Sequence, residues 1–109
     1  MIVTLQVMSY TMSKIQDVID DLVRRKRSVS CNGGTGLLFI LRDLGFVDKE
    51  GQTPGHRVFT HPKLSKLTDY TTHSIDCGHK PNREMKFQYV QNTIRILRKY
   101  QAELEVIND

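Results

Sequence analysis

The sequence predicts an α+β domain in which a three-stranded antiparallel meander packs against helices on one face, giving two layers. Two observations support this. Apolar residues recur at helical spacing before residue 45 and after residue 86, whereas the segment between them alternates like strands and is punctuated by Gly and Pro. The chain has 109 residues, which suits a single domain over 1–109 with one modest core.

The first helix is expected from Ser13 to Arg27. Ser13, followed three residues later by Gln16, forms a capping-box pattern. The basic run 24–27 suits the negative end of the helix dipole, and we interpret it in that way rather than as an RNA-binding patch. The apolar stripe of this helix consists of Ile15, Val18, Ile19, Leu22 and Val23.

A second helix is expected from about Thr35 to Leu44, because a stripe of leucines ends at Gly45, the residue type that commonly closes a helix. A short strand then begins at 45–47. Further strands are expected at 56–60 and 71–77, where β-branched and aromatic residues alternate with polar ones. The basic segment 63–69 is predicted to be a loop.

A single long helix is predicted to end the chain. Asn82 is a candidate cap before it, and the acidic segment 101–109 is expected to fray. Its apolar stripe consists of Phe87, Val90, Ile94, Leu97 and Leu104.

Positive charge is concentrated in one part of the chain. Residues 56–99 contain nine Lys or Arg against three acidic residues, whereas 1–55 contain seven against six. Residues 100–109 contain three acidic residues and no Lys or Arg. Such an imbalance favours a polyanionic partner, most often nucleic acid. On charge alone, a solvated basic face without a partner stays an open alternative.

The sequence also bears on localisation. No apolar run reaches the roughly 18 residues needed to span a bilayer, and 1–10 lack the pattern of a secretory signal, so we expect a cytoplasmic protein without membrane contact. Cys31 and Cys77 are therefore expected to be reduced thiols, although a disulfide between them is possible.

Several short motifs resemble the centre of HicA toxins, which are small ribonucleases of toxin–antitoxin systems. They are Leu44-Gly45-Phe46, then Gly55-His56-Arg57-Val58-Phe59 with His61-Pro62, and later Gly78, Lys86 and Tyr89-Val90. The resemblance covers about 33–99, so 33–105 is assigned to a HicA-like core and 13–30 to an N-terminal helical extension. The family usually has a Ser or Thr between the glycine and the histidine, whereas here Gly55 directly precedes His56.

The resemblance implies a fold and an activity. The fold would be a double-stranded-RNA-binding-domain-like α-β-β-β-α sandwich with an additional N-terminal helix. The activity would be metal-independent cleavage of mRNA or other single-stranded RNA, neutralised by a HicB-type antitoxin.

The candidate catalytic residue is His56. RNA carries its own nucleophile, the 2′-hydroxyl, and a histidine with an ordinary pKa near 6.5 can accept its proton without a metal or other cofactor. His73 is a possible partner acid, and His61 is predicted to be structural. The candidate RNA-binding residues are Arg57, His79, Lys80, Arg83 and Lys86.

Other readings compete with this one. Cys77-Gly78-His79 with another histidine offers zinc ligands, but the paired spacing of structural zinc sites is missing, so no metal is expected. A non-catalytic RNA-binding module of the same fold would need the basic residues but no general base. An inactive toxin relic would act only as a protein-interaction domain.

Overall fold

The structure is a computed structural model, and it describes residues 13–78 and 80–108. None of the helices in this part of the chain is long and apolar enough to cross a membrane. In chain order the elements are α1 (Lys14–Arg25), η2 (Lys26–Ser28, a 3₁₀ turn), α2 (Leu37–Asp43), β1 (Val47–Glu50), β2 (His56–Thr60), α3 (Pro62–Leu67), β3 (His73–Asp76), α4 (Phe87–Lys99) and α5 (Gln101–Ile107).

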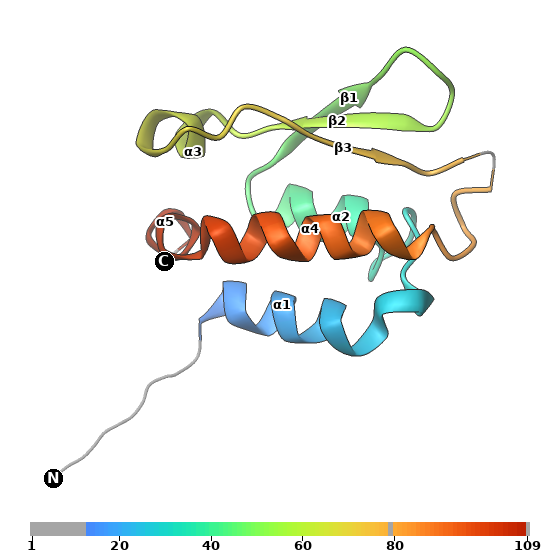
Figure 1. Cartoon of the computed structure of the whole chain (residues 1–109), viewed down its shortest axis with the longest axis horizontal. Helices are drawn as coiled ribbons and strands as arrows, with labels where there is room; N and C mark the ends of the chain where they lie inside the picture. The colour runs from blue at the N-terminus through green and yellow to red at the C-terminus, as the bar shows by residue number, and fades with distance from the viewer. Residues whose placement is uncertain (1–12, 79, 109) are drawn as a thin grey trace, which may run out of the picture.

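The predicted α+β class and the antiparallel meander are confirmed. The sheet has the strand order β1-β2-β3, with both pairs antiparallel. Figure 1 shows α2 and α4 beneath one face of this sheet and α1 on the far side of α4. These three helices therefore form two tiers on the same side of the sheet, while α3 lies beside one end of it (Figure 1). The opposite face carries no helix in the described part of the chain.

The register of β2 divides the sheet residues between its two faces. Phe59 lies opposite His73, and Arg57 lies opposite Ile75, on the face that meets the helices, where Phe59 and Ile75 are fully buried. Because side chains alternate along a strand, the other positions form an outer face. That outer face consists of Val47, Lys49, His56, Val58, Thr60, Ser74 and Asp76.

The segment 13–30, interpreted from sequence as an extension, contributes to the same core as the rest of the chain. Ile15, Ile19 and Leu22 of α1 are at most 1% exposed and belong to one cluster with residues of the sheet and of α4. The predicted cap is confirmed, since Ser13 Oγ accepts a hydrogen bond from the Gln16 amide at 3.0 Å.

The end of α2 is as predicted, although this helix begins at Leu37 rather than Thr35. Gly45 follows it with a φ of +97°, which a residue with a side chain rarely adopts. The Gly45 amide donates to Arg42 O and the Phe46 amide to Leu41 O, both at 3.0 Å, the two bonds of a Schellman motif. The first strand consequently begins at Val47, two residues later than expected.

The prediction of a loop over 63–69 is wrong, because Pro62–Leu67 form helix α3. His61 caps this helix: its Nδ1 accepts a hydrogen bond from the Leu64 amide at 3.2 Å. Pro62 follows at the first helical position, where its missing N–H costs nothing and its φ is already helical.

The prediction of one continuous C-terminal helix is also wrong, because the chain turns at Tyr100 and continues as α5. The turn carries Leu104 into the core, where it is fully buried, and brings α5 against α1 and α3. Burial of Leu104 explains why 101–107 form a helix instead of fraying. The third strand is shorter than predicted and spans His73–Asp76.

The expectation of reduced thiols is contradicted by a disulfide between Cys31 and Cys77, whose Cα atoms lie 5.8 Å apart. Cys31 is in the loop after η2 and Cys77 follows β3, so the bond joins two segments 46 residues apart in sequence. Only the packing of helices against the sheet brings these segments together, which the spacing of the cysteines does not reveal.

Candidate functional site

A cavity of about 630 Å³ lies between the β1–β2 loop, the end of β3 and the segment before α4. Three of the cations predicted to bind RNA line it: Lys80, Arg83 and Lys86. All three are exposed. The wall also contains Thr53, Pro54, Asp76, Cys77, Gly78, Glu84, Met85 and Tyr89. The structure thus gathers three separated basic residues around one hollow that also holds two carboxylates and an aromatic ring.

The segment that carries these cations is anchored to the loop after η2, although it forms no helix and only one isolated bridge. The anchors are the disulfide Cys31–Cys77, the hydrogen bonds from the Asn32 amide to Pro81 O at 3.1 Å and from the Met85 amide to Val29 O at 2.8 Å, and the bridge between Ser30 and Glu84. A backbone fixed at several points can hold exposed side chains at defined positions around the cavity.

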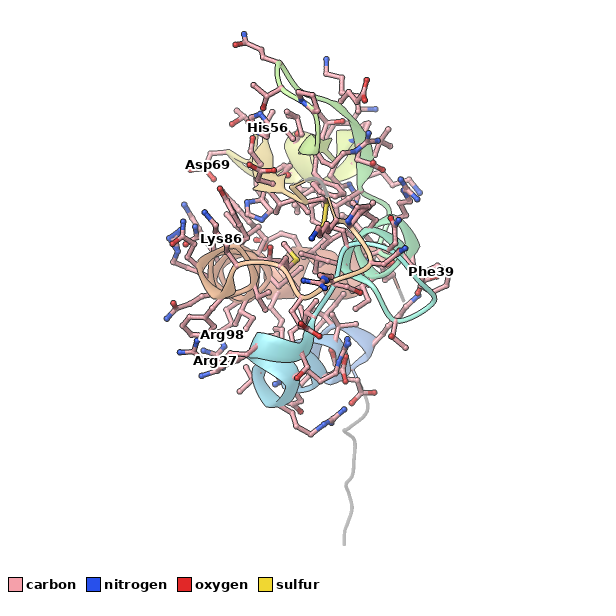
Figure 2. All side chains as sticks on the ribbon, turned by 90° about the vertical axis from the view of Figure 1, so that its right-hand side faces the viewer. Arg27, Phe39, His56, Asp69, Lys86 and Arg98 are labelled. Carbon is pink, nitrogen blue, oxygen red and sulfur yellow. A yellow bond between two sulfur atoms is a disulfide. The ribbon has the colours of Figure 1, made fainter. Side chains whose placement is uncertain are left out.

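His56 begins β2 and lies on the outer face of the sheet, directly opposite Asp76. Asp76 lines the cavity, whereas His56 is beside it and not part of its wall. The imidazole packs over Gly51, where an added Cβ would lie 2.7 Å from Nδ1. Figure 2 shows His56 on the sheet above Lys86.

Position 55 requires a glycine because the β1–β2 loop packs closely against the backbone of Gly78 beside the cavity. Its φ is +86°, and an added Cβ would collide with the backbone oxygen of Gly78. The Cys77 amide also donates to Gly55 O at 2.8 Å. The loop therefore lies directly on the end of β3, which places Thr53 and Pro54 on the rim of the cavity.

Arg57, predicted to contact RNA, faces away from His56. Its guanidinium pairs with Asp48 at 2.6 Å, and Arg42 pairs with the same carboxylate at 2.7 Å. The hydrogen bond from Arg42, reinforced by Arg57, lowers the pKa of Asp48 to about 2. Arg57 and Arg42 therefore share one carboxylate, and Arg57 is not part of the cavity wall.

His73 does not approach His56, because it faces the helices from β3. Its Nε2 lies 2.7 Å from Thr93 Oγ1, and that hydroxyl donates its proton to Tyr89 O at 2.9 Å. The hydroxyl must accept from the imidazole, so Nε2 carries the proton. Burial, together with the charge of Arg95, lowers the pKa of His73 to about 4. The imidazole of His73 thus contacts Thr93 on the helix side of the sheet, whereas His56 lies on the outer face.

The structural role predicted for His61 is confirmed. The side chain is 1% exposed, and its Nε2 lies 3.0 Å from Leu44 O while Nδ1 caps α3. Because Nδ1 accepts, Nε2 is the donor to Leu44 O. His79 lies outside the described residues. Among 13–78 and 80–108 no group of three or more metal-ligating side chains comes together, and the sulfur of Cys77 is held by Cys31.

Asp76 and Tyr89 are site residues that sequence reasoning did not single out. Alternation along 71–77 places Asp76 on the face opposite Ile75, so its exposure was predictable. Its position across from His56 depends on the strand register, which a single sequence does not define. Tyr89 reaches the cavity from the first turn of α4, whereas from sequence it was named only as part of the Tyr89-Val90 pair of the resemblance.

In comparisons with known proteins, no family model, curated protein or solved structure matches this chain.

Proposed function

We propose that this chain is a metal-independent endoribonuclease of the HicA toxin type, built on a double-stranded-RNA-binding-domain-like arrangement. The order α2-β1-β2-β3-α4, with both helices on one face of the sheet, supports the fold assignment. The helix α3 is an insertion between β2 and β3, and α1 is the additional helix. The observation that carries the function is that His56 lies across from Asp76 at the edge of a cavity lined by three cations.

The chemistry follows from these positions. RNA bound with a phosphate near Lys80, Arg83 and Lys86 presents its 2′-hydroxyl to His56, which removes the proton. The 2′-oxygen then bonds to phosphorus, and the P–O5′ bond breaks as the 5′-oxygen takes a proton from solvent. The products are a 2′,3′-cyclic phosphate and a 5′-hydroxyl. Fixed cations stabilise the negative charge that grows on the phosphate oxygens.

A His56→Ala variant tests this assignment. In buffer containing EDTA, we expect the parent to cleave a single-stranded RNA and the variant to lose about 100-fold to 10,000-fold in rate, the usual contribution of a general base. Ser74→Ala, on the same outer face, is the matched control and is expected to cleave like the parent. Circular dichroism checks that each variant is folded.

Three outcomes separate the competing functions. Equal cleavage by His56→Ala and the parent removes His56 from the mechanism. RNA binding without cleavage by the parent identifies a non-catalytic RNA-binding module. Absence of both, with capture of a protein partner, identifies a protein-interaction domain.

The resemblance also supports a protein partner, a HicB-type antitoxin. An acidic surface on that partner would cover the cations around the cavity and block RNA. Co-expression with the product of a neighbouring small reading frame is expected to give a stable complex that does not cleave RNA. A complex that cleaves RNA as fast as the free chain would contradict neutralisation at this site.

A further inference from the structure

A second basic surface begins at the cavity and follows the exposed side of α4. We call it the α4 face, and define it as Lys26, Arg27, Lys86, Phe87, Gln91, Asn92, Arg95 and Arg98. The exposed residues of α4 within it recur at helical spacing and therefore share one side of the helix. Figure 2 shows Arg27, Lys86 and Arg98 along one side of the molecule and Phe39 on the other.

The five cations of the α4 face have no acidic partner among the described residues. The salt bridges of this part of the chain join other groups, at Asp21, Asp43 and Asp48. Asp69, which lies on the same side in Figure 2, accepts a hydrogen bond from Tyr100 Oη at 2.8 Å. The face therefore presents uncompensated positive charge, which repels itself in the free protein and attracts a polyanion.

An aromatic ring joins the two parts of this face. The guanidinium of Arg27 lies 4.6 Å from the centre of the Phe87 ring, and the ammonium of Lys26 lies 5.9 Å from it. These cation–π contacts hold the cations of η2 beside the first turn of α4. Lys86, the residue before that turn, lines the cavity, so the α4 face is continuous with the candidate site.

The length of the face corresponds to a short strand of RNA. From Lys86 to Arg98 the helix rises about 18 Å, at about 1.5 Å per residue. A stacked strand advances about 3.4 Å per nucleotide, so this length accommodates about five nucleotides. The part of this length nearer Arg98 contains a hollow of about 400 Å³ lined by Gln91, Asn92, Ile94, Arg95 and Arg98. Their amide and guanidinium groups can donate hydrogen bonds to phosphate.

We propose that the α4 face binds the backbone of a single-stranded RNA whose cleaved phosphate lies in the cavity. This inference rests on the proposed function and adds the path of the substrate to it. An RNA strand fits better than a protein partner, because the large exposed apolar residues of the described chain, Phe39, Val47, Leu67 and Val106, all lie outside this face. Protein interfaces have an apolar centre, whereas contacts to phosphates need only charge and donors.

The test is a pair of double variants with equal loss of charge. Arg95→Gln/Arg98→Gln removes two cations of the α4 face, and Lys63→Gln/Lys66→Gln removes two exposed cations of α3 as the control. Binding of a 2′-O-methyl RNA of 12 nucleotides, which cannot be cleaved, is measured by fluorescence anisotropy at several salt concentrations. Cleavage of an RNA tetranucleotide is measured in parallel.

For the α4-face variant we expect the slope of log K against log salt to fall by about 1.4, since each phosphate contact on a single strand contributes about 0.7. If the two proteins bind equally at about 1 M salt, the same slope predicts affinity lower by about 25-fold at 0.1 M salt. The control is expected to keep the slope of the parent. Cleavage of the tetranucleotide is expected to be unchanged in both variants. With its central phosphate in the cavity it extends about 7 Å on either side, at about 3.4 Å per nucleotide, whereas Arg95 lies about 13.5 Å along the helix from Lys86.

The outcomes distinguish this inference from the proposed function. An unchanged salt slope in the α4-face variant, or an equal loss in the control, overturns the RNA path even when the tetranucleotide is cleaved. A change of slope confined to the α4-face variant supports the path even when no RNA is cleaved, which would overturn only the ribonuclease. Stronger competition by polyglutamate than by RNA at equal charge would assign the face to an acidic protein and overturn the proposal.

Discussion

The two ends of the sheet use the same residue types in opposite ways. At one end, which we call the capped end, His61, Tyr70 and Tyr100 are buried and bonded to Leu44, Phe59 and Asp69 respectively. At the other, the hairpin end, His56 and the cations of the cavity remain accessible. A histidine or a charge is therefore informative about function only when the fold has not already supplied its partner.

The capped end is also joined by ring contacts. Phe46 meets the rings of Phe59, His61 and Tyr70 edge to face, and Tyr70 meets Tyr100 in the same way. Burial raises the pKa of Tyr70, so its hydroxyl stays protonated and donates to Phe59 O at 2.9 Å. The hairpin end has no such cluster in the described chain, and its irregular segment is held by backbone bonds and the disulfide.

The largest expected effect comes from removing the disulfide that holds the hairpin end. Closing a loop of 46 residues restricts the unfolded chain, and by the chain-entropy relation Cys31→Ser/Cys77→Ser should lower the free energy of unfolding by about 4 kcal/mol. Denaturant titration measures this loss. Hydrogen exchange should accelerate more at 77–86 than at the capped end. Equal acceleration at both ends would show that the disulfide does not stabilise the hairpin end more than the capped end.

Next in size is His61→Ala, which removes the cap of α3 and the donor to Leu44 O. The loss of two hydrogen bonds and the cavity left behind a buried ring should cost about 3 kcal/mol of stability. RNA affinity, compared with the parent below both melting temperatures, should stay the same. A weaker affinity would mean that the capped end contributes to binding.

Acid should destabilise the fold through His73. Its folded pKa of about 4 lies below the ordinary value of 6.5, so the unfolded state takes up a proton first as the pH falls. This contribution is complete above pH 6.5 and is lost between pH 6.5 and pH 4, amounting to a loss on the order of 3 kcal/mol. Asp48, with a pKa of about 2, acts only below that window.

The pH effect is checked with His73→Gln, whose amide cannot titrate but can donate to Thr93. Melting temperatures of the parent and variant should diverge at neutral pH and converge as the pH falls from 6.5 to 4. Parallel curves would show that another group produces the acid sensitivity.

The smallest expected effect has opposite signs for stability and binding. Lys86→Gln removes one of the unpaired cations, so the free energy of unfolding should rise by about 0.3 kcal/mol as repulsion falls. RNA affinity should fall, with the salt slope lower by about 0.7. Differential scanning calorimetry measures the free energy of unfolding, and fluorescence anisotropy measures the RNA affinity and its salt slope. A fall in both would mean that Lys86 has a structural partner in solution.

Much of the fold was predictable from local patterns. The Ser13 cap, the Gly45 helix end and the strand at 56–60 each follow from the local sequence. Serine favours helix caps, glycine favours the positive φ that ends a helix, and alternating β-branched and aromatic residues favour strands. The break at Tyr100 was hidden because Leu104 stays in phase with Leu97, so an apolar stripe passes through a turn without interruption. The cap at His61 was missed because Ser, Thr, Asp and Asn are the usual residues at that position.

The candidate site was only partly predictable. Lys80, Arg83 and Lys86 were found because basic residues cluster in sequence there. The alternation of side chains indicates that Arg57 and His73 face away from His56, because Arg57 shares its side of the sheet with Phe59 and His73 shares it with Ile75. The opposition of His56 and Asp76 depends on the length of the hairpin loop and on register, which are properties of the folded sheet.

Because the His56 imidazole packs over Gly51, a substitution at Gly51 can change the orientation of the imidazole without replacing His56. A methyl group at position 51 would press on Nδ1 and rotate the ring while leaving its composition unchanged. Larger side chains there would turn it further. A graded series of substitutions at this glycine would therefore change the orientation of the His56 imidazole while the residue itself stays the same.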